Sequence, residues 1–261
     1  MSSTTQEQST STPIDGRTWR QYFPKGDLWV FGYGSLIWKP PPHYDQRVPG
    51  YIEGYVRRFW QASTDHRGTP EHPGRVVTVI ERGFWETLDD PLAHLDKDTT
   101  RVWGTAYHIP SSHAEEVHDY LDVREIDGYS VHYTPFHAKT DTDAQTTPIT
   151  CMVYIGQPSN PQFLRSPSQR DPQAVAEVIA QGVGASGKNT EYLYLLEKAL
   201  EGVGLGSADG HVTDLVRRVS EIEGGGEAKR EEEKAGRDIR VSLAEAGGED
   251  GRGNGEGDLA E

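Results

Sequence analysis

The sequence lacks most features that mark secreted, membrane-bound or nucleic-acid-binding proteins. Cys151 is the only cysteine, so no disulfide can form within the chain, which fits a reducing compartment. No stretch reaches the roughly 18 apolar residues of a membrane span, and the polar N-terminus has no apolar signal-peptide core. Acidic residues outnumber basic ones by 41 to 26, and the net charge of −15 argues against nucleic acid and anionic membranes as partners. We expect a cytoplasmic protein with a core-packed thiol.

Both ends of the chain are poor in the apolar residues that a folded core needs. The segment from Glu221 to Glu261 has no aromatic residue and holds 10 of the 29 glycines, together with 13 acidic and 6 basic residues. The segment from Met1 to Gly16 is rich in Ser, Thr and Gln and has no apolar run. We predict disordered termini over residues 1–16 and 223–261, and one folded domain over residues 17–222, which is long enough for a sizeable core.

Six short segments rich in β-branched and aromatic residues are bounded by Gly, Pro or polar turns, which is typical of strands. They are Leu28 to Tyr33, Gly54 to Ala62, Val76 to Glu81, Val102 to Ile109, Ser130 to His137 and Ile149 to Ile155. The polar stretches between them, Thr87 to Thr100 and Ala138 to Thr147, are predicted surface loops.

Helical patterns dominate the end of the chain. One earlier helix is expected after Ser112, which forms a capping-box pattern with Glu115, and its apolar face is Ala114, Val117, Tyr120 and Leu121. Three later helices are expected, beginning at Asp171-Pro172, spanning Thr190 to Leu200, and carrying Val212, Leu215, Val216 and Val219. Strands first and helices last predict an α+β fold with a mainly antiparallel, barrel-like sheet.

An apolar strand runs directly into a glycine-rich turn near the N-terminus. The turn from Gly32 to Ser35 precedes three successive prolines, Pro40 to Pro42. Glycine has no Cβ, so the backbone N–H groups of this turn can approach a ligand closely and hold a carboxylate or a developing oxyanion. An ordinary tight turn between two strands explains the spacing equally well.

A glutamate follows the apolar face of the earlier helix and precedes the Gly128 turn. Glu125 is placed to point inward, and partial burial would raise its pKa and make it a better proton acceptor near neutral pH. The alternative is a helix-end glutamate paired with Arg124 or Arg101 in a surface network. Glu116 lies away from the apolar face on helical geometry, so we expect it to be solvated or structural.

The end of the second predicted strand and the loop that follows it concentrate polar side chains, including Gln61, Ser63, Arg67 and, further on, Arg75. The two guanidinium groups are candidates for binding ligand carboxylates, and the other two side chains for hydrogen-bonding an amide. The alternative is a structured hairpin loop in which Asp65 bonds to its own backbone, and for His66 alone we prefer this interpretation.

The segment from Gly182 to Asn189 imitates dinucleotide- and phosphate-binding motifs. Both motifs must follow a strand, whereas Ala174 to Gln181 reads as a helix, and Asn189 stands where a P-loop needs Ser or Thr. We therefore predict a flexible connection between helices, with Asn189 capping the second. The ten histidines show no metal-ligand spacing, so no metal is expected. No Gly-x-Ser-x-Gly elbow is present for a serine hydrolase.

Five segments together closely resemble the ChaC-like γ-glutamylcyclotransferases, in that family's order. They are Val30 to Trp38, Arg57 to Gln61, Ser63 to Gly68, Tyr120 to Glu125, and Asn189 to Leu193, and the resemblance runs from about Trp29 to Val219. It implies the γ-glutamylcyclotransferase-like fold, a small mixed β-barrel surrounded by helices. It also implies cleavage of glutathione, the small-molecule substrate, to 5-oxoproline and cysteinylglycine without a cofactor.

The resemblance assigns roles to particular residues. Glu125 matches the family's catalytic glutamate, and the run Val30, Phe31, Gly32, Tyr33, Gly34 and Ser35 matches its substrate-binding loop. Tyr129, Arg75 and Tyr192 fall in matching motifs. The chain departs from the pattern at Asp127 and Ala62, where the family has glycines, and the segment from Phe84 to Thr100 is longer than usual.

The leading hypothesis is a glutathione-specific γ-glutamylcyclotransferase. One alternative retains the chemistry but takes other γ-glutamyl amino acids or amines as substrates. A second alternative, from another class, is a non-catalytic binding protein that retains the pocket and uses its acidic tail to bind a partner.

Overall fold

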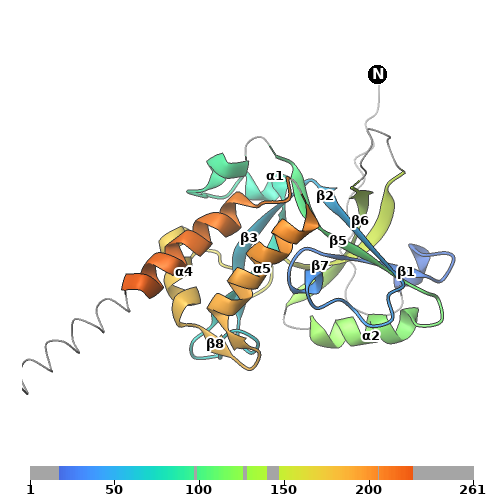
Figure 1. Cartoon of the computed structure of the whole chain (residues 1–261), viewed down its shortest axis with the longest axis horizontal. Helices are drawn as coiled ribbons and strands as arrows, with labels where there is room; N and C mark the ends of the chain where they lie inside the picture. Colours follow the sequence, from blue (N-terminus) through green and yellow to red (C-terminus); the bar gives the residue numbers. More distant parts are fainter. Residues whose placement is uncertain (1–17, 97–98, 126–127, 140–146, 205, 226–261) are drawn as a thin grey trace, which may run out of the picture. The chain divides into compact units, whose positions relative to one another are not determined.

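The structure is a computed structural model, and we describe its residues 18–96, 99–125, 128–139, 147–204 and 206–225 (Figure 1). The chain divides into two compact units, Met1–Val219 and Ser220–Glu261. Of the second unit only residues 220–225 are described, and they are helical. The predicted disordered segment 1–16 lies outside the described residues, as does all but the start of the predicted segment 223–261.

The first unit is built around a closed five-stranded barrel with the strand order β1-β5-β2-β6-β7. Its strands are β1 Leu28–Gly32, β2 Gln46–Glu53, β5 Arg101–Ile109, β6 Tyr129–Ala138 and β7 Ile149–Gly156. All neighbours pair antiparallel except β1 and β7, which are parallel and place Val30 opposite Met152. Strands β3 Tyr55–Ser63 and β4 Gly74–Glu81 form a separate two-stranded sheet. The predicted mixed, mainly antiparallel barrel is confirmed.

Strand β2 is missing from the sequence-based prediction, because its Pro49-Gly50 pair resembles a turn. In the structure Pro49 lies opposite Thr105 in the β2–β5 ladder. A Cβ at Gly50 would lie 2.5 Å from the Phe136 ring and 2.2 Å from the carbonyl oxygen of His137. The close approach of β6 therefore requires a glycine here, and tertiary packing overrides the local preference for a turn.

The four predicted helices occur in the predicted order, together with two four-residue helices that the sequence does not predict. They are α1 Arg82–Trp85, α2 Ala114–Arg124, α3 Pro167–Arg170, α4 Pro172–Gln181, α5 Asn189–Val203 and a last helix over residues 210–225, with 3₁₀ turns η1 Thr18–Gln21, η2 Ser35–Ile37 and η3 Ala93–Asp96. Asp171 caps α4 as expected, since its carboxylate accepts hydrogen bonds from the N–H groups of Gln173 and Ala174, both at 3.0 Å.

Two predicted caps are wrong. The N-cap of α2 is His113 rather than Ser112, and its side chain makes no capping hydrogen bond. Asn189 is the first residue of α5 and faces strand β4 instead, where its amide accepts from the N–H of Arg75 at 2.6 Å and donates to the Arg75 carbonyl at 2.7 Å. This side chain thus continues the edge of β4 with a backbone-like pair of hydrogen bonds.

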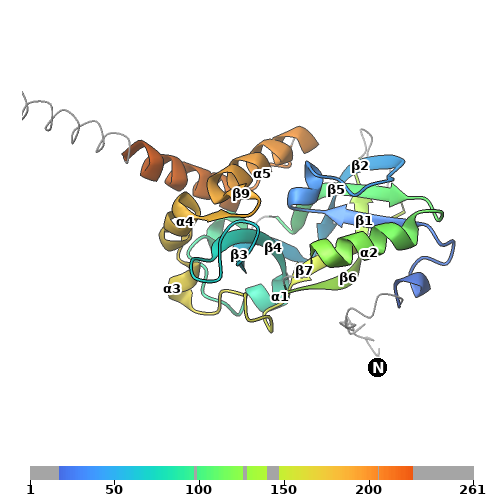
Figure 2. The same cartoon turned by 90° about the horizontal axis from the view of Figure 1, so that it is seen from below.

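Helix α2 packs on the barrel next to β1, and both views show it there (Figures 1 and 2). Its buried side chains Val117 and Leu121 join Leu28 and Met152 in one hydrophobic cluster. Tyr120, by contrast, is 45 % exposed, so the apolar face is narrower than predicted. Cys151 is buried in β7 as expected, and burial raises the pKa of its thiol.

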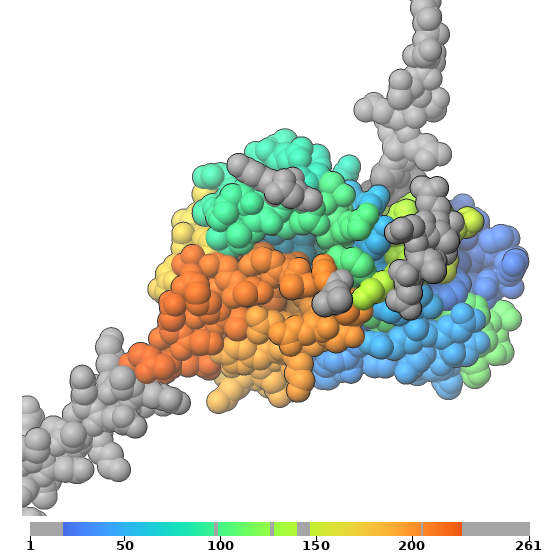
Figure 3. Space-filling view, turned by 45° about the horizontal axis from the view of Figure 1, so that its top comes forward, coloured from blue at the N-terminus to red at the C-terminus, as the bar shows by residue number. Residues whose placement is uncertain are grey.

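The predicted loop between β4 and β5 is anchored to the interior by Arg58. Its fully buried guanidinium donates to Asp90 at 2.7 Å and to Asp96, in η3, at 2.6 Å. In Figure 3 the green atoms of this part of the chain lie beside orange atoms from the C-terminal part of the first unit. A Cβ at Gly210, the first residue of the last helix, would lie 3.2 Å from Cβ of Leu95. Among the described residues, no helix is long and apolar enough to cross a membrane.

Candidate active site

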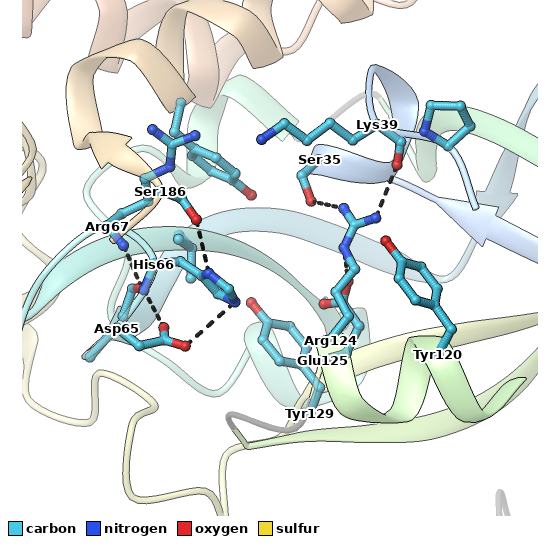
Figure 4. Close-up of a pocket in the computed structure, with 15 residues that line it drawn as sticks. Ser35, Lys39, Asp65, His66, Arg67, Tyr120, Arg124, Glu125, Tyr129 and Ser186 are labelled. Atoms are coloured by element: carbon cyan, nitrogen blue, oxygen red, sulfur yellow. Dashed lines mark hydrogen bonds and ion pairs between the residues drawn. The ribbon is translucent and has the colours of Figure 1, made fainter. Parts of the chain in front are cut away.

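Two joined cavities lie between α2, the η2 turn and the β3–β4 sheet. The inner one, of about 40 Å³, is lined by Phe31, Tyr33, Gly34, Ser35, Leu36, Val77, Glu125, Tyr129, Tyr154 and Tyr192. The outer one, of about 320 Å³, is lined by residues that include Lys39, Ser63, Asp65, His66, Arg67, Tyr120, Arg124 and Ser186 (Figure 4). Ser35, Glu125, Tyr129 and Tyr192 line both cavities. These four residues therefore mark the junction.

The glycines of the turn are required by close packing. A Cβ at Gly34 would lie 2.8 Å from Cγ1 of Val77, and one at Gly32 would lie 2.6 Å from Cβ of Leu36. The Tyr107 hydroxyl, buried inside the barrel, donates a hydrogen bond to the Leu36 carbonyl at 2.9 Å and fixes the η2 turn from below. The turn is thus a tightly packed wall of the inner cavity.

Four of the six residues predicted to form the substrate loop line the inner cavity: Phe31, Tyr33, Gly34 and Ser35. Val30 instead packs into the hydrophobic cluster beneath α2, and Gly32 is not among the lining residues. The Tyr33 hydroxyl donates to the Tyr154 carbonyl at 2.7 Å, which anchors the loop to β7.

Glu125 lies at the C-terminal cap of α2, where its N–H donates to the Leu121 carbonyl at 2.8 Å. Its side chain is 18 % exposed and lines both cavities. Burial raises the pKa of this carboxyl group, while the charges of Arg124 and His66 lower it by a smaller amount. The net rise favours a group that can accept and return a proton near neutral pH.

Arg124 connects the helix end to the glycine turn. Its guanidinium donates to Ser35 Oγ at 2.9 Å and to the Lys39 carbonyl at 3.1 Å, and its Nε lies 3.3 Å from Oε1 of Glu125 (Figure 4). From the sequence alone, Arg124 is expected only to be a surface partner of Glu125. The other candidate partner, Arg101, pairs with Glu53 instead.

A polar row of three side chains forms the opposite wall of the outer cavity. The imidazole of His66 lies 3.1 Å from Ser186 Oγ through Nδ1 and 3.4 Å from Asp65 Oδ2 through Nε2 (Figure 4). The sequence pattern alone predicts only an ordinary loop residue at His66. The carboxylate of Asp65 does accept the N–H of His66, as expected for that loop.

Ser186 comes from the glycine-rich segment that we expected to be a flexible connection between helices. That expectation is wrong, because β8 Val183–Gly184 and β9 Gly187–Lys188 form a short hairpin. The N–H groups of Ala185 and Ser186 donate to the carbonyls of Asp65 and His66 at 2.7 and 2.9 Å. The hairpin is thereby attached to the cavity wall.

Of the four other polar candidates, two line the outer cavity and two do not. Ser63 and Arg67 line the outer cavity, but one Arg67 nitrogen is bonded to the Lys188 carbonyl at 2.8 Å and to Glu191 at 3.0 Å. Arg75 lines neither of the two cavities, and its guanidinium folds back onto the carbonyls of residues 73 and 74. Gln61 is fully buried and contacts Gln162 at 3.2 Å.

Three possible metal ligands that are remote in sequence lie together outside these cavities. His43, His113 and Glu116 present donor atoms that all lie within 4.8 Å of one another, although the histidine spacing gave no indication of such a group. Glu116 is exposed as expected, and the two histidines lower its pKa. None of the three residues lines either cavity.

Comparisons with known proteins agree on one family. The family model described as ChaC-like protein matches residues 28–222. The Schizosaccharomyces pombe glutathione-specific gamma-glutamylcyclotransferase is 44 % identical over 197 residues, which cover 75 % of this chain and 94 % of that protein. The Saccharomyces cerevisiae protein of the same name is 39 % identical over 214 residues, covering 72 % and 91 %.

A solved structure gives the same result. The crystal structure of the yeast gamma-glutamyl cyclotransferase specific to glutathione superposes with a TM-score of 0.68 at 36 % identity, and the match covers 75 % of this chain and 96 % of that one. The barrel and the surrounding helices are therefore shared with that enzyme. Sequence, structure and family model together show that the chain is a member of the ChaC-like protein family.

Proposed function

We propose that this chain is a glutathione-specific γ-glutamylcyclotransferase, a lyase that converts glutathione to 5-oxoproline and cysteinylglycine. The observation that carries this proposal is the position of Glu125, a largely buried carboxyl group at the junction of a small and a larger cavity. The names of the relatives from two yeasts, at 39 to 44 % identity, support the same activity.

The two cavities divide the substrate between them. The inner cavity, beside the Gly34-Ser35 turn, would hold the γ-glutamyl head, and the outer one would hold the leaving dipeptide. The amide bond to be broken then lies at the junction, within reach of Glu125. The free α-amine and the γ-carbonyl carbon belong to the same γ-glutamyl group, so the attack is intramolecular and the site would only have to orient the two groups.

The reaction moves two protons from the attacking nitrogen to the departing nitrogen. An α-amine has a pKa of about 7.7 to 8.0 and is mostly protonated at neutral pH, so it must lose a proton before it can attack. Glu125 would accept this first proton, and the neutral amine would then attack the γ-carbonyl carbon to close the five-membered ring. As the old C–N bond breaks, the carboxyl group would pass its proton to the departing nitrogen. It would then carry the second proton from the ring nitrogen to the departing amine, so that the lactam keeps one N–H and the dipeptide leaves as an ammonium. Atoms and charge balance without a metal or another cofactor.

The glycine turn would stabilise the negative charge that develops on the carbonyl oxygen. Ser35 and Leu36 begin the η2 turn, so their N–H groups have no intrahelical acceptor, and no other backbone acceptor for them occurs in the described part of the chain. A single oxyanion donor of this kind contributes about 3 kcal/mol to other enzymes.

We assign the activity to a catalytic domain over residues 17–222 and place it in the cytoplasm. The second assignment is supported by the absence of disulfide-forming cysteine pairs and by the deep burial of Cys151, the one thiol.

The test is 5-oxoproline release by the purified chain from reduced glutathione, oxidised glutathione and γ-glutamyl-alanine. Release from reduced glutathione alone is the expected result. Release from γ-glutamyl-alanine instead would retain the chemistry and overturn the substrate assignment. No release from any of the three would favour a non-catalytic binding protein.

A further inference from the structure

We infer that Lys39 binds the C-terminal carboxylate of the leaving peptide, which makes the outer cavity a subsite for γ-glutamyl peptides that end in a free carboxylate. This inference rests on the proposed function and assigns a ligand group to a part of the site that the γ-glutamyl head does not reach. Lys39 lines the outer cavity and is absent from the lining of the inner one.

The backbone of Lys39 is held on both sides by residues of the proposed site. Its N–H donates to the Ser35 carbonyl at 2.8 Å, and its own carbonyl accepts from Arg124 at 3.1 Å. The side chain extends along one edge of the outer cavity, with the ammonium group directed toward the side of Ser186 and Arg67 (Figure 4). Because the backbone is fixed, the flexible Lys39 side chain can place its ammonium group only in a limited part of the outer cavity.

Three lysine and arginine side chains line the outer cavity, and Lys39 is the one whose charge is not paired with an acidic side chain. Arg124 is bonded to Ser35 and paired with Glu125, and Arg67 is paired with Glu191 at 3.0 Å. The ammonium of Lys39 has no hydrogen-bond or ion-pair partner within the described residues. A carboxylate is the complementary group for an exposed ammonium of this kind.

The acidic side chains that line the outer cavity are not partners of the Lys39 ammonium. Asp65 accepts the N–H of His66 and also contacts its imidazole on the opposite wall, and Glu125 lies beside Arg124 at the junction. The edge of the cavity at Lys39 is therefore positively charged, whereas the junction carries the proposed base. A peptide that places its amide at the junction and its terminal carboxylate at the outer edge matches this separation of charge.

The outer cavity is large enough for a leaving peptide. At about 320 Å³ it lies within the range of about 300–1,000 Å³ that is usual for small-ligand pockets.

The experiment compares glutathione with its C-terminal amide as substrates, with steady-state 5-oxoproline release as the readout. The proteins are the wild type, Lys39→Met, Lys39→Arg and the control Lys25→Met, in which an exposed lysine outside both cavities is changed in the same way. The wild type and Lys25→Met should show a KM about fivefold lower for glutathione than for the amide. Lys39→Met should raise the KM for glutathione to that of the amide at nearly unchanged kcat, and Lys39→Arg should retain the preference.

Ionic strength provides a second readout. The preference of the wild type for glutathione should shrink at high salt, because an exposed ion pair is screened, while Lys39→Met should show no such dependence. Equal KM values for the two substrates in the wild type, or an undiminished preference in Lys39→Met, would overturn the inference and leave the proposed function standing. No 5-oxoproline from either substrate with the wild type would overturn both.

Discussion

The guanidinium of Arg124 donates a hydrogen bond to Ser35 Oγ at 2.9 Å and lies 3.3 Å from the carboxylate of Glu125. One side chain therefore links the end of α2 to the glycine turn that lines the inner cavity. These two elements are 89 residues apart in the chain. We regard Arg124 as a positioning residue that fixes the proposed base relative to the turn.

Replacing Arg124 by Gln should lower kcat/KM on the order of 10- to 100-fold, because the base and the turn lose their common partner. The low-pH limb of the kcat/KM profile should also move to higher pH. The positive charge of Arg124 lowers the pKa of Glu125, so its removal raises that pKa, and the carboxylate form then appears only at higher pH. Arg101→Gln, which alters an exposed arginine on the barrel, is the control. An unchanged pH profile in Arg124→Gln would contradict this role.

Gly34→Ala should reduce both activity and stability. The added Cβ would lie 2.8 Å from Val77 and 3.2 Å from the Tyr192 hydroxyl, and overpacking of this kind costs about 1–3 kcal/mol. The matched control is Gly83→Ala in α1, where a Cβ meets nothing within 4 Å, and it should be neutral or stabilise by about 0.4–1 kcal/mol. Urea unfolding and 5-oxoproline release measure the two effects. Equal stabilities of the two variants would be the contrary result.

The sequence predicts the elements of this fold better than it predicts their ends and contacts. Periodicity identifies α4 and α5, and β-branched runs identify six strands, because these patterns report one-sided burial directly. Strand β2 is missed because Gly50 is required by the approach of Phe136, a contact that local sequence does not contain.

The candidate site likewise contains residues that the sequence predicts and residues that it does not. Glu125 and the glycine turn follow from composition and from the family resemblance. Arg124, Lys39 and Ser186 do not, because their roles arise from the meeting of α2, the turn and the β8–β9 hairpin. The proximity of Arg124 to Glu125 in the sequence is the one signal that pointed toward it.

Asp90→Ala should destabilise the protein by about 3–5 kcal/mol, because Arg58 loses a partner while its guanidinium remains fully buried. The Asp90 carboxylate also accepts the indole N–H of Trp85 at 2.8 Å, so the loop before β5 would lose a second attachment. Asp89→Ala changes an exposed neighbour and should stay within about 0.5 kcal/mol of the wild type. Equal urea midpoints for the two variants would show that the buried pair does not anchor the loop.

His211 should make the stability fall in mildly acidic solution. Its Nε2 accepts the N–H of Phe59 at 3.1 Å, and burial, with the charges of Arg58 and Arg57, lowers its pKa well below the ordinary value. Below about pH 6.5 the unfolded chain protonates this histidine while the folded chain does not, so the free energy of unfolding decreases as the pH falls.

The contribution of this one group is at most about 1.4 kcal/mol per pH unit. His211→Gln retains an acceptor for the Phe59 N–H and removes the titration. Urea unfolding between pH 6.5 and 5.5 should therefore show a smaller loss of stability in this variant than in the wild type. Parallel slopes would mean that His211 becomes protonated within the fold.

The central claim is that Glu125 carries the proton in lactam formation, and Glu125→Gln tests it most directly. The amide has nearly the same size as the carboxylate and lacks its basicity, so 5-oxoproline release from glutathione should fall by about 10²- to 10⁴-fold. Calorimetric binding of glutathione to the variant should remain within a fewfold of the wild type, since the two cavities are unchanged. A correctly folded Glu125→Gln protein with wild-type turnover would contradict the account.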